Sequence, residues 1–292
     1  MKKVLTFLSI SILTLFFVVG TASAVPFTNW SISLDGENEL VVTDYLTFSG
    51  SVYVENEATD LPGVYAFNQW ATFNAQNETT DTIQDIFPEH QLTGVFAASG
   101  IAELDMPMPG ELPTGADFIF NEGTLDLYVA SPRVYGTADN FYGAAVGEHI
   151  AEFTLTSGKG NVGFDPNNPE GDINTTFISE WIEAGFLFAP DGTDLAFLDP
   201  FAVSNVTSTI VFPSPGDVKW DNFIAGLEEF AGLNVNEAEF PEAFFLRSSG
   251  EFRPGEVPVP PVPVPEPASM FLFGAGLLGL AAFGRKKIMK KD

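Results

Sequence analysis

Apolar and polar residues alternate along most of the chain between residues 25 and 256. In "GTLDLYVA" the alternation places Leu125, Leu127 and Val129 on one face, and in "IAEFTLTSGKG" it does the same for residues 151, 153 and 155. A period of two, interrupted by Gly, Pro, Asn and Asp, is typical of an antiparallel β-sandwich or barrel. Of the two, we expect an all-β body folded as a jelly-roll-like antiparallel sandwich.

Further runs of the same kind predict the remaining strands. "ELVVTDYLTFSGSVYVE" divides into two β-rich runs around Ser49-Gly50-Ser51. Later segments continue the pattern, namely "TTFIS", "GFLFA", "DLAFLD" and "NVTSTIVFP". Asp191-Gly192, between two of these runs, is a typical dipeptide of a hairpin turn.

One segment changes period. In "DNFIAGLEEFAGLN", Phe223, Leu227 and Phe230 recur at helical spacing, and Asp221 stands where an N-cap is expected. We therefore expect one short amphipathic helix within the β body.

The amino terminus is typical of a secretory signal peptide. Two lysines follow Met1, an uncharged apolar run extends from Val4 to Gly20, and Ala22-Ser23-Ala24 supplies the small residues that a signal peptidase requires. We expect residues 1–24 to be removed after Ala24. The alternative is a membrane anchor that is retained.

The carboxyl terminus has three parts. Residues 257–267 are rich in proline, which favours an extended polyproline II spacer reaching roughly 34 Å. Residues 268–284 carry no charge and are just long enough for a membrane-spanning helix. Residues 285–292 begin with Arg285, Lys286 and Lys287, which predicts a cytoplasmic basic tail.

Pro265-Glu266-Pro267, followed by this Gly- and Leu-rich segment and the basic end, resembles the PEP-CTERM sorting signal. The resemblance implies removal of the tail by an exosortase, an integral-membrane protease-transpeptidase, and transient anchoring in the inner membrane. It also implies export to the surface or matrix of a Gram-negative bacterium that makes exopolysaccharide and biofilm. The alternative is a plain C-terminal membrane anchor, which has the same hydropathy and charge pattern.

The body is similar, over softer β and turn patterns, to the flocculation-associated PEP-CTERM proteins. The similarity lies between residues 125 and 212, in "LDLYVA", "IAEFTLTSGKGNV", "GDINTTFISEWIEAGFLFAPDGTDLAF" and "SNVTSTIVF". It implies a role in cell aggregation or in retention of matrix, and it supplies no catalytic residues.

Charge narrows the choice of partners. Between Val25 and Pro267 the chain has five basic and 38 acidic residues, and hence a net charge of −33. Such a surface repels nucleic acid and anionic lipid, and it favours divalent cations and cationic or neutral polymers. The chain also contains no cysteine, which excludes disulfides, thiolate catalysis and cysteine-bound zinc.

Two kinds of binding site are predicted from the body. The oxygen-rich loop "GFDPNNPEGDINTT" places Asp165, Asn167 and Asp172 where they could bind calcium, although such residues also cluster in ordinary turns. Trp70 and Trp220 have polar neighbours and are candidate sugar-stacking platforms. Trp181, by contrast, lies in an apolar run, and we expect it in the core.

No catalytic motif is present. His90 and His149 lack the spacing of a metal site, and an abundance of carboxylates is not by itself a sign of hydrolysis. We therefore expect a non-catalytic exported protein that associates with exopolysaccharide in biofilm or flocculation, with calcium as the one candidate cofactor. The alternatives are a carbohydrate-binding module with a specific glycan site, a carboxylate-based matrix glycosidase, and a body that serves only as a spacer.

Overall fold

The structure covers most of the β-rich body between residues 25 and 257. The computed structural model describes residues 25–77, 83, 86–105, 113–164, 170–198, 201–212, 220–235 and 242–257. Residues 24–257 form one compact unit, and every strand pairing described below lies within it. The predicted signal peptide, the proline-rich segment beyond Val257, the membrane helix and the basic tail lie outside the described residues.

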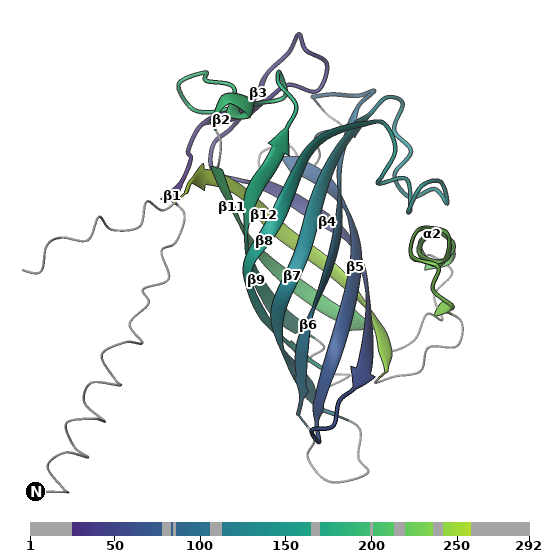
Figure 1. Ribbon diagram of the computed structural model, residues 1–292. Helices are drawn as coiled ribbons and strands as arrows, with labels where there is room; N and C mark the ends of the chain where they lie inside the picture. The colour runs from purple at the N-terminus through teal and green to yellow at the C-terminus, as the bar shows by residue number, and fades with distance from the viewer. Residues whose placement is uncertain are drawn as a thin grey trace, which may run out of the picture. The chain divides into compact units, whose positions relative to one another are not determined.

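Eight long antiparallel strands of the described body close into a barrel (Figure 1). Each strand pairs with the next one along the barrel, and β12 returns to pair with β4 from Ala243 opposite Glu55 to Phe252 opposite Leu46. The barrel strands are β4 (Leu46–Ala58), β5 (Val64–Asn77), β6 (Gln91–Leu104), β7 (Gly115–Ala130), β8 (Glu148–Gly163), β9 (Glu170–Ile182), β11 (Phe201–Phe212) and β12 (Ala243–Glu256).

The predicted sandwich is therefore wrong. Alternation identifies which residues of a strand share a face, but it carries no information on whether the first and last strands meet. The Ser49-Gly50-Ser51 break is also absent, because β4 runs through it without interruption. Only glycine fits at position 50, because a Cβ there would lie 1.8 Å from the Thr72 carbonyl oxygen on the neighbouring strand.

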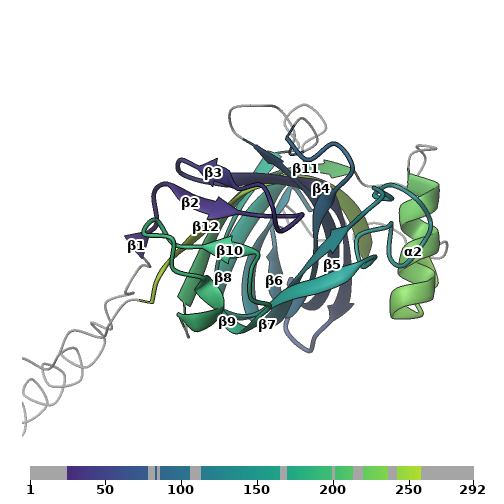
Figure 2. The same ribbon diagram turned by 90° about the horizontal axis from the view of Figure 1, so that it is seen from above.

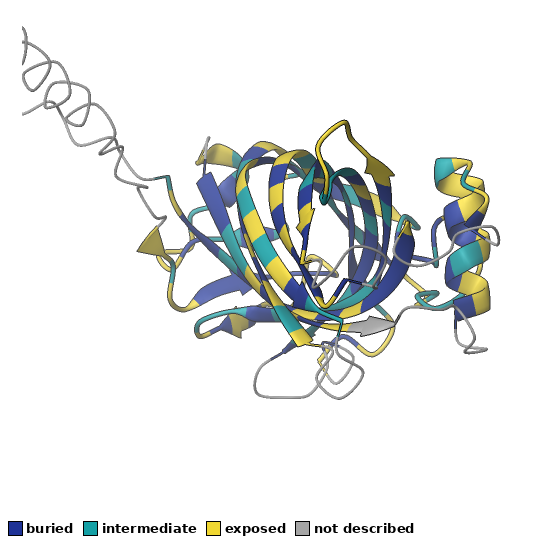
Figure 3. Ribbon diagram, turned by 90° about the horizontal axis from the view of Figure 1, so that it is seen from below, coloured by how far each residue is buried: buried dark blue, intermediate teal, exposed yellow. Residues whose placement is uncertain are grey.

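The expected faces of individual strands are confirmed. Leu125, Leu127 and Val129 of β7 are buried, and so are Phe153 and Leu155 of β8. Viewed from below, buried residues line the inside of the barrel and alternate with exposed residues along each strand (Figure 3). The core therefore fills the barrel interior, and the outer wall carries most of the polar side chains.

A small second sheet covers one end of the barrel (Figure 2). Its strands are β2 (Trp30–Ile32), β3 (Leu40–Val42) and β10 (Leu187–Phe188). Trp30 is fully buried, and its ring centroid lies 6.1 Å from that of Phe252. The apolar side of this sheet thus continues the barrel core. A further short strand, β1 (Val25–Pro26), pairs with the end of β12.

The segment after β10 contains one confirmed and one wrong prediction. Gly192 has φ +82°, and the Thr193 N–H donates to Asp191 Oδ1 at 3.0 Å, which confirms the turn at Asp191-Gly192. "DLAFLD", expected as a strand, contains the 3-10 helix η3 (Leu195–Phe197). Asp194 begins it, because its carboxylate accepts from the Ala196 N–H at 3.0 Å and so favours a helical turn over an extended chain.

The predicted amphipathic helix is confirmed as α2 (Asp221–Ala231), outside the barrel wall (Figure 2). Trp220, and not Asp221, is its N-cap residue, and no side chain caps that end. Phe223 and Leu227 are buried as expected, whereas Phe230 is half exposed. Within the described residues, no helix is both long enough and apolar enough to cross a bilayer.

The loop between β7 and β8, residues 131–147, joins α2 to the wall. Gln91 of β6 anchors this loop, since its side chain accepts from the N–H groups of Val134 and Tyr135 and donates to the Gly143 carbonyl. Beneath the loop and α2 lies a second apolar cluster on the outside of the barrel, which includes Phe245. One side of the outer wall is thereby buried.

Contact between α2 and this loop leads to a first prediction. Gly226 faces the loop so closely that a Cβ would lie 2.7 Å from the Tyr142 nitrogen and 3.1 Å from Phe141 Cα. Gly226→Ala should therefore lower the free energy of unfolding by about 1–3 kcal/mol, although alanine is the better helix former. Chemical denaturation of the body measures this effect. Glu229→Ala, exposed on the same helix, is the control and should change stability by less than about 0.5 kcal/mol. A Gly226→Ala variant as stable as the wild type would contradict the close packing.

Candidate functional site

The four tryptophans differ in their access to solvent. Trp220 is only 2% exposed and packs on Phe245 and Phe223, so neither face of its ring is available to a sugar. Trp181, expected in the core, is 41% exposed. Trp70 is partly buried and lines a surface groove. Trp70 thus remains a candidate sugar-stacking platform, Trp220 is too buried to be one, and Trp181 becomes a further candidate.

A β-bulge explains why Trp181 was misplaced. Phe177 and Ser179 face the barrel interior, and strict alternation would turn Trp181 the same way. The pairing of β8 with β9 shifts instead, so that Glu152 lies opposite Trp181 while Phe153 lies opposite Ser179. The extra residue, Glu180, moves Trp181 to the outer face.

Trp70 stands at one end of a groove on the outer wall. The groove has a volume of about 580 Å³ and crosses β5 to β8. Its floor includes a row of cross-strand neighbours in which Trp70 is followed by Ala97, Thr124 and Thr154. The Trp70 ring also stacks on Tyr53, with 6.2 Å between ring centroids. This packing on the second cluster restrains the indole at the edge of the groove.

Polar side chains form the neighbouring row of the groove. Asn68, Ser99 and Glu122 lie opposite one another on β5, β6 and β7. Ser99 Oγ donates to Glu122 Oε1 at 3.0 Å, which orients the carboxylate along the wall. An amide, hydroxyls and a carboxylate thus lie beside an aromatic ring, a combination suited to the polar and apolar faces of a sugar.

A more tightly connected cluster borders the groove on its other side. Asp126, Glu152 and Trp181 are cross-strand neighbours in the next row of the wall. His149 lies between two aromatic rings, with centroids 4.8 Å from Tyr128 and 5.2 Å from Trp181. Its Nε2 is hydrogen-bonded to Asp126 Oδ1 at 3.0 Å. Stacking and hydrogen bonding together fix the orientation of the imidazole.

The surroundings of this cluster disfavour the ionised forms of Asp126 and Tyr128. Burial is the main cause that raises the pKa of Asp126, the charge of Glu152 raises it further, and His149 opposes the shift. Burial, followed by the charges of Asp126 and Glu152, raises the pKa of Tyr128. Asp126 and Glu152 lie directly opposite each other and repel when both are ionised. The pair therefore lowers the stability of the fold, and folding does not require it.

Of the three predicted calcium ligands, only Asp172 lies within the described residues. Asp165 and Asn167 lie outside the described residues. Asp172 is exposed on β9, where its carboxylate accepts from Ser208 Oγ at 3.4 Å. Across the described ranges, no group of three or more His, Asp or Glu side chains could hold a metal ion.

Sequence reasoning missed most of this cluster. Asp126, His149 and Glu152 are separated by up to 26 positions and have no motif spacing. Only the register of β7 with β8 brings them together. A usable signal was the polar side of the β7 alternation, where Asp126 and Tyr128 occur between inward leucine and valine residues.

The raised pKa of Asp126 leads to a prediction about pH. Because the folded state holds this proton more tightly than the unfolded chain does, stability should fall as the pH rises from about 4 through the raised pKa. Asp126→Asn should remove this loss and raise the melting temperature at pH 7, as measured by thermal unfolding between pH 4 and 8. Asp117→Asn removes the same formal charge from an exposed position of β7 and is the matched control. Equal pH profiles for the two variants would contradict the prediction.

Comparison with known proteins identifies the carboxyl-terminal segment. No curated protein matches the chain. A solved structure of the enduracididine biosynthesis enzyme MppR with HEPES buffer bound is 13% identical, with a TM-score of 0.16, and the match covers 82% of this chain and 96% of that one. A TM-score this low carries no argument about fold or function. The family model of the PEP-CTERM protein-sorting motif matches residues 263–287, which identifies this segment as a PEP-CTERM sorting signal and supports an exported substrate of an exosortase.

Proposed function

We propose that the barrel binds a polysaccharide of the extracellular matrix without cleaving it, and that it does so through the Trp70 groove. After sorting, the body would present this groove to the matrix. It would then retain exopolysaccharide at the cell surface and promote biofilm formation or flocculation. One observation carries the proposal: an aromatic ring borders a groove of about 580 Å³ that is lined by both polar and small apolar side chains.

The chemistry of sugars fits this surface. The C–H faces of a pyranose are apolar and stack on an indole, while the hydroxyls at the ring edge require hydrogen-bond partners. Asn68, Ser99, Glu122 and Thr124 supply such partners close to Trp70. The floor is the wall of a sheet and not a closed pocket, which suits a polymer that extends beyond the site at both ends.

A second candidate function, hydrolysis of a matrix glycan, is favoured by the pair Asp126 and Glu152. The two residues lie directly opposite each other on β7 and β8, and the pKa of Asp126 is raised as a general acid requires. The contact with His149 counts against this role, because it lowers the pKa of Asp126 and so opposes the rise. We therefore place binding ahead of hydrolysis.

The proposal predicts how substitutions in the groove change binding. In co-sedimentation of the body with the host's own exopolysaccharide, Trp70→Ala should weaken binding at least about tenfold, because stacking on an aromatic ring is lost. Thr124→Arg fills the groove from an exposed position without touching Tyr53 and should have the same effect. Phe197→Ala is the control, since this ring is 76% exposed on η3 and does not line the groove.

Other outcomes of the same assay separate the alternatives. Binding abolished by a chelator but unaffected by Trp70→Ala would contradict the groove and favour calcium bridging of the acidic surface. Release of reducing ends, lost in Asp126→Asn or Glu152→Gln, would establish the glycosidase instead. Absence of binding under every condition would leave the body as a spacer.

The sorting signal gives a separate prediction for the living cell. Replacing Pro265, Glu266 and Pro267 by alanine should leave the tail attached, because the exosortase no longer recognises it. Immunoblots of membrane and extracellular fractions should then show a longer protein in the membrane and a loss of flocculation. Replacing the prolines at 258, 260 and 261 instead is the control, because these positions precede the matched motif and belong to the spacer. A tail removed as efficiently as in the wild type would contradict dependence on the motif.

A further inference from the structure

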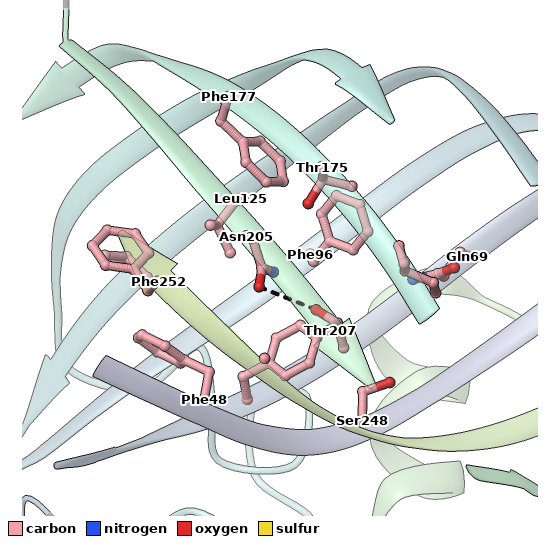
Figure 4. A pocket seen from close by; sticks show the side chains of 14 residues that line it. Phe48, Gln69, Phe96, Leu125, Thr175, Phe177, Asn205, Thr207, Ser248 and Phe252 are labelled. Atoms are coloured by element: carbon pink, nitrogen blue, oxygen red, sulfur yellow. Dashed lines mark hydrogen bonds between the residues drawn. The ribbon is translucent and has the colours of Figure 1, made fainter. Parts of the chain in front are cut away.

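The barrel interior contains a small cavity that differs from the groove in all its lining residues except Gln69. Its volume is about 30 Å³. Phe48, Phe96 and Phe177 are among the apolar side chains that surround it, and Figure 4 shows them around one space with polar groups from β5, β9, β11 and β12. The polar lining residues are Gln69, Thr175, Asn205, Thr207 and Ser248.

This polar layer is unusual for the centre of a barrel core. Thr207 Oγ1 donates to Asn205 Oδ1 at 3.1 Å, which satisfies one pair of groups. Ser248 is 5% exposed, and its hydroxyl has no hydrogen-bond partner within the described part of the chain. Buried hydroxyls are almost always paired, and an unpaired one destabilises the fold. Ser248 thus directs an unsatisfied hydroxyl toward a cavity.

The polar side chains of Asn205 and Thr207 have room because residue 250 is a glycine. A Cβ at Gly250 of β12 would lie 2.4 Å from Thr207 Oγ1 and 2.6 Å from Asn205 Oδ1. The hydroxyl and the amide therefore keep their positions only because residue 250 has no side chain. An apolar core of ordinary residues would have closed this space, since protein interiors pack without voids.

We propose that the cavity is a binding site for a small neutral molecule that carries a hydroxyl or amide group. Neutrality follows from the lining, which contains no charged side chain among the described residues. A water molecule needs roughly 10–15 Å³ on this scale, so the cavity accepts about two such groups, or a ligand of about three heavy atoms. The Ser248 hydroxyl and the amides hydrogen-bond the polar end, and the phenylalanine rings contact its carbon atoms.

The proposal is tested with formamide and ethanol as probes. In NMR titrations of the body, whose pairings are all internal, either probe should shift the amide signals of residues that line the cavity, Asn205 and Thr207 among them. Ser248→Ala should weaken binding at least tenfold. It should also raise the melting temperature in probe-free buffer, because it removes an unpaired hydroxyl. Butan-1-ol, which is too large for the cavity, should leave the same signals unchanged.

Thr209→Val provides the matched control. Thr209 is the cross-strand neighbour of Ser248, its buried hydroxyl also lacks a partner in the described structure, and it does not line the cavity. This variant should likewise raise the melting temperature but leave probe binding unchanged. Probe binding that is equal in Ser248→Ala and wild type would overturn the proposal. So would a crystal structure in which ordered water alone fills the cavity and neither probe displaces it.

Discussion

The antiparallel ladder between β12 and β4 is the interaction on which the rest of the structure depends. Without it, the eight long strands would form an open sheet with unpaired N–H and C=O groups along its edges and an uncovered hydrophobic inner face. With it, every barrel strand has two neighbours and the phenylalanine-rich faces enclose one another. Ten cross-strand pairs link the two strands, from Ala243 with Glu55 to Phe252 with Leu46. The outer groove and the inner cavity exist only because this ladder curves the sheet into a tube.

Closure also separates an enclosed inner face from the outer wall. The inner face carries buried aromatic side chains such as Phe67, Phe153 and Phe244, and its polar layer lies among phenylalanine and leucine residues. The outer wall divides into a side buried by α2 and the 131–147 loop and a side that carries the groove and the His149 cluster. Trp70 lies at the boundary, stacked on Tyr53 beneath the covered part while lining the groove. The feature that stabilises the wall therefore also holds the candidate binding residue.

The sequence predicted local structure well and long-range structure poorly. Alternation placed Leu125, Leu127 and Phe153 correctly, because burial of one strand face depends on neighbouring residues only. The closure could not be predicted, because it pairs residues that lie 188 to 206 positions apart in the sequence. Trp181 was assigned to the wrong side because a single bulge reverses the parity of a strand. The sorting signal, in contrast, is a linear motif that an enzyme reads without a folded context, so its residues were sufficient to recognise it.

The short strand β1 gives the barrel a mechanical property. Val25 pairs with Glu256 and Pro26 with Gly255, so the body begins and ends side by side at one rim. The chain leaves from the end of β12 toward its sorting signal, and a load applied through that attachment enters the barrel along β12. This strand is hydrogen-bonded to β11 and β4 on its two sides over most of its length. Tension along the strand axis therefore shears many hydrogen bonds at once and does not peel them one by one, so the barrel resists a pull applied at this end of the chain.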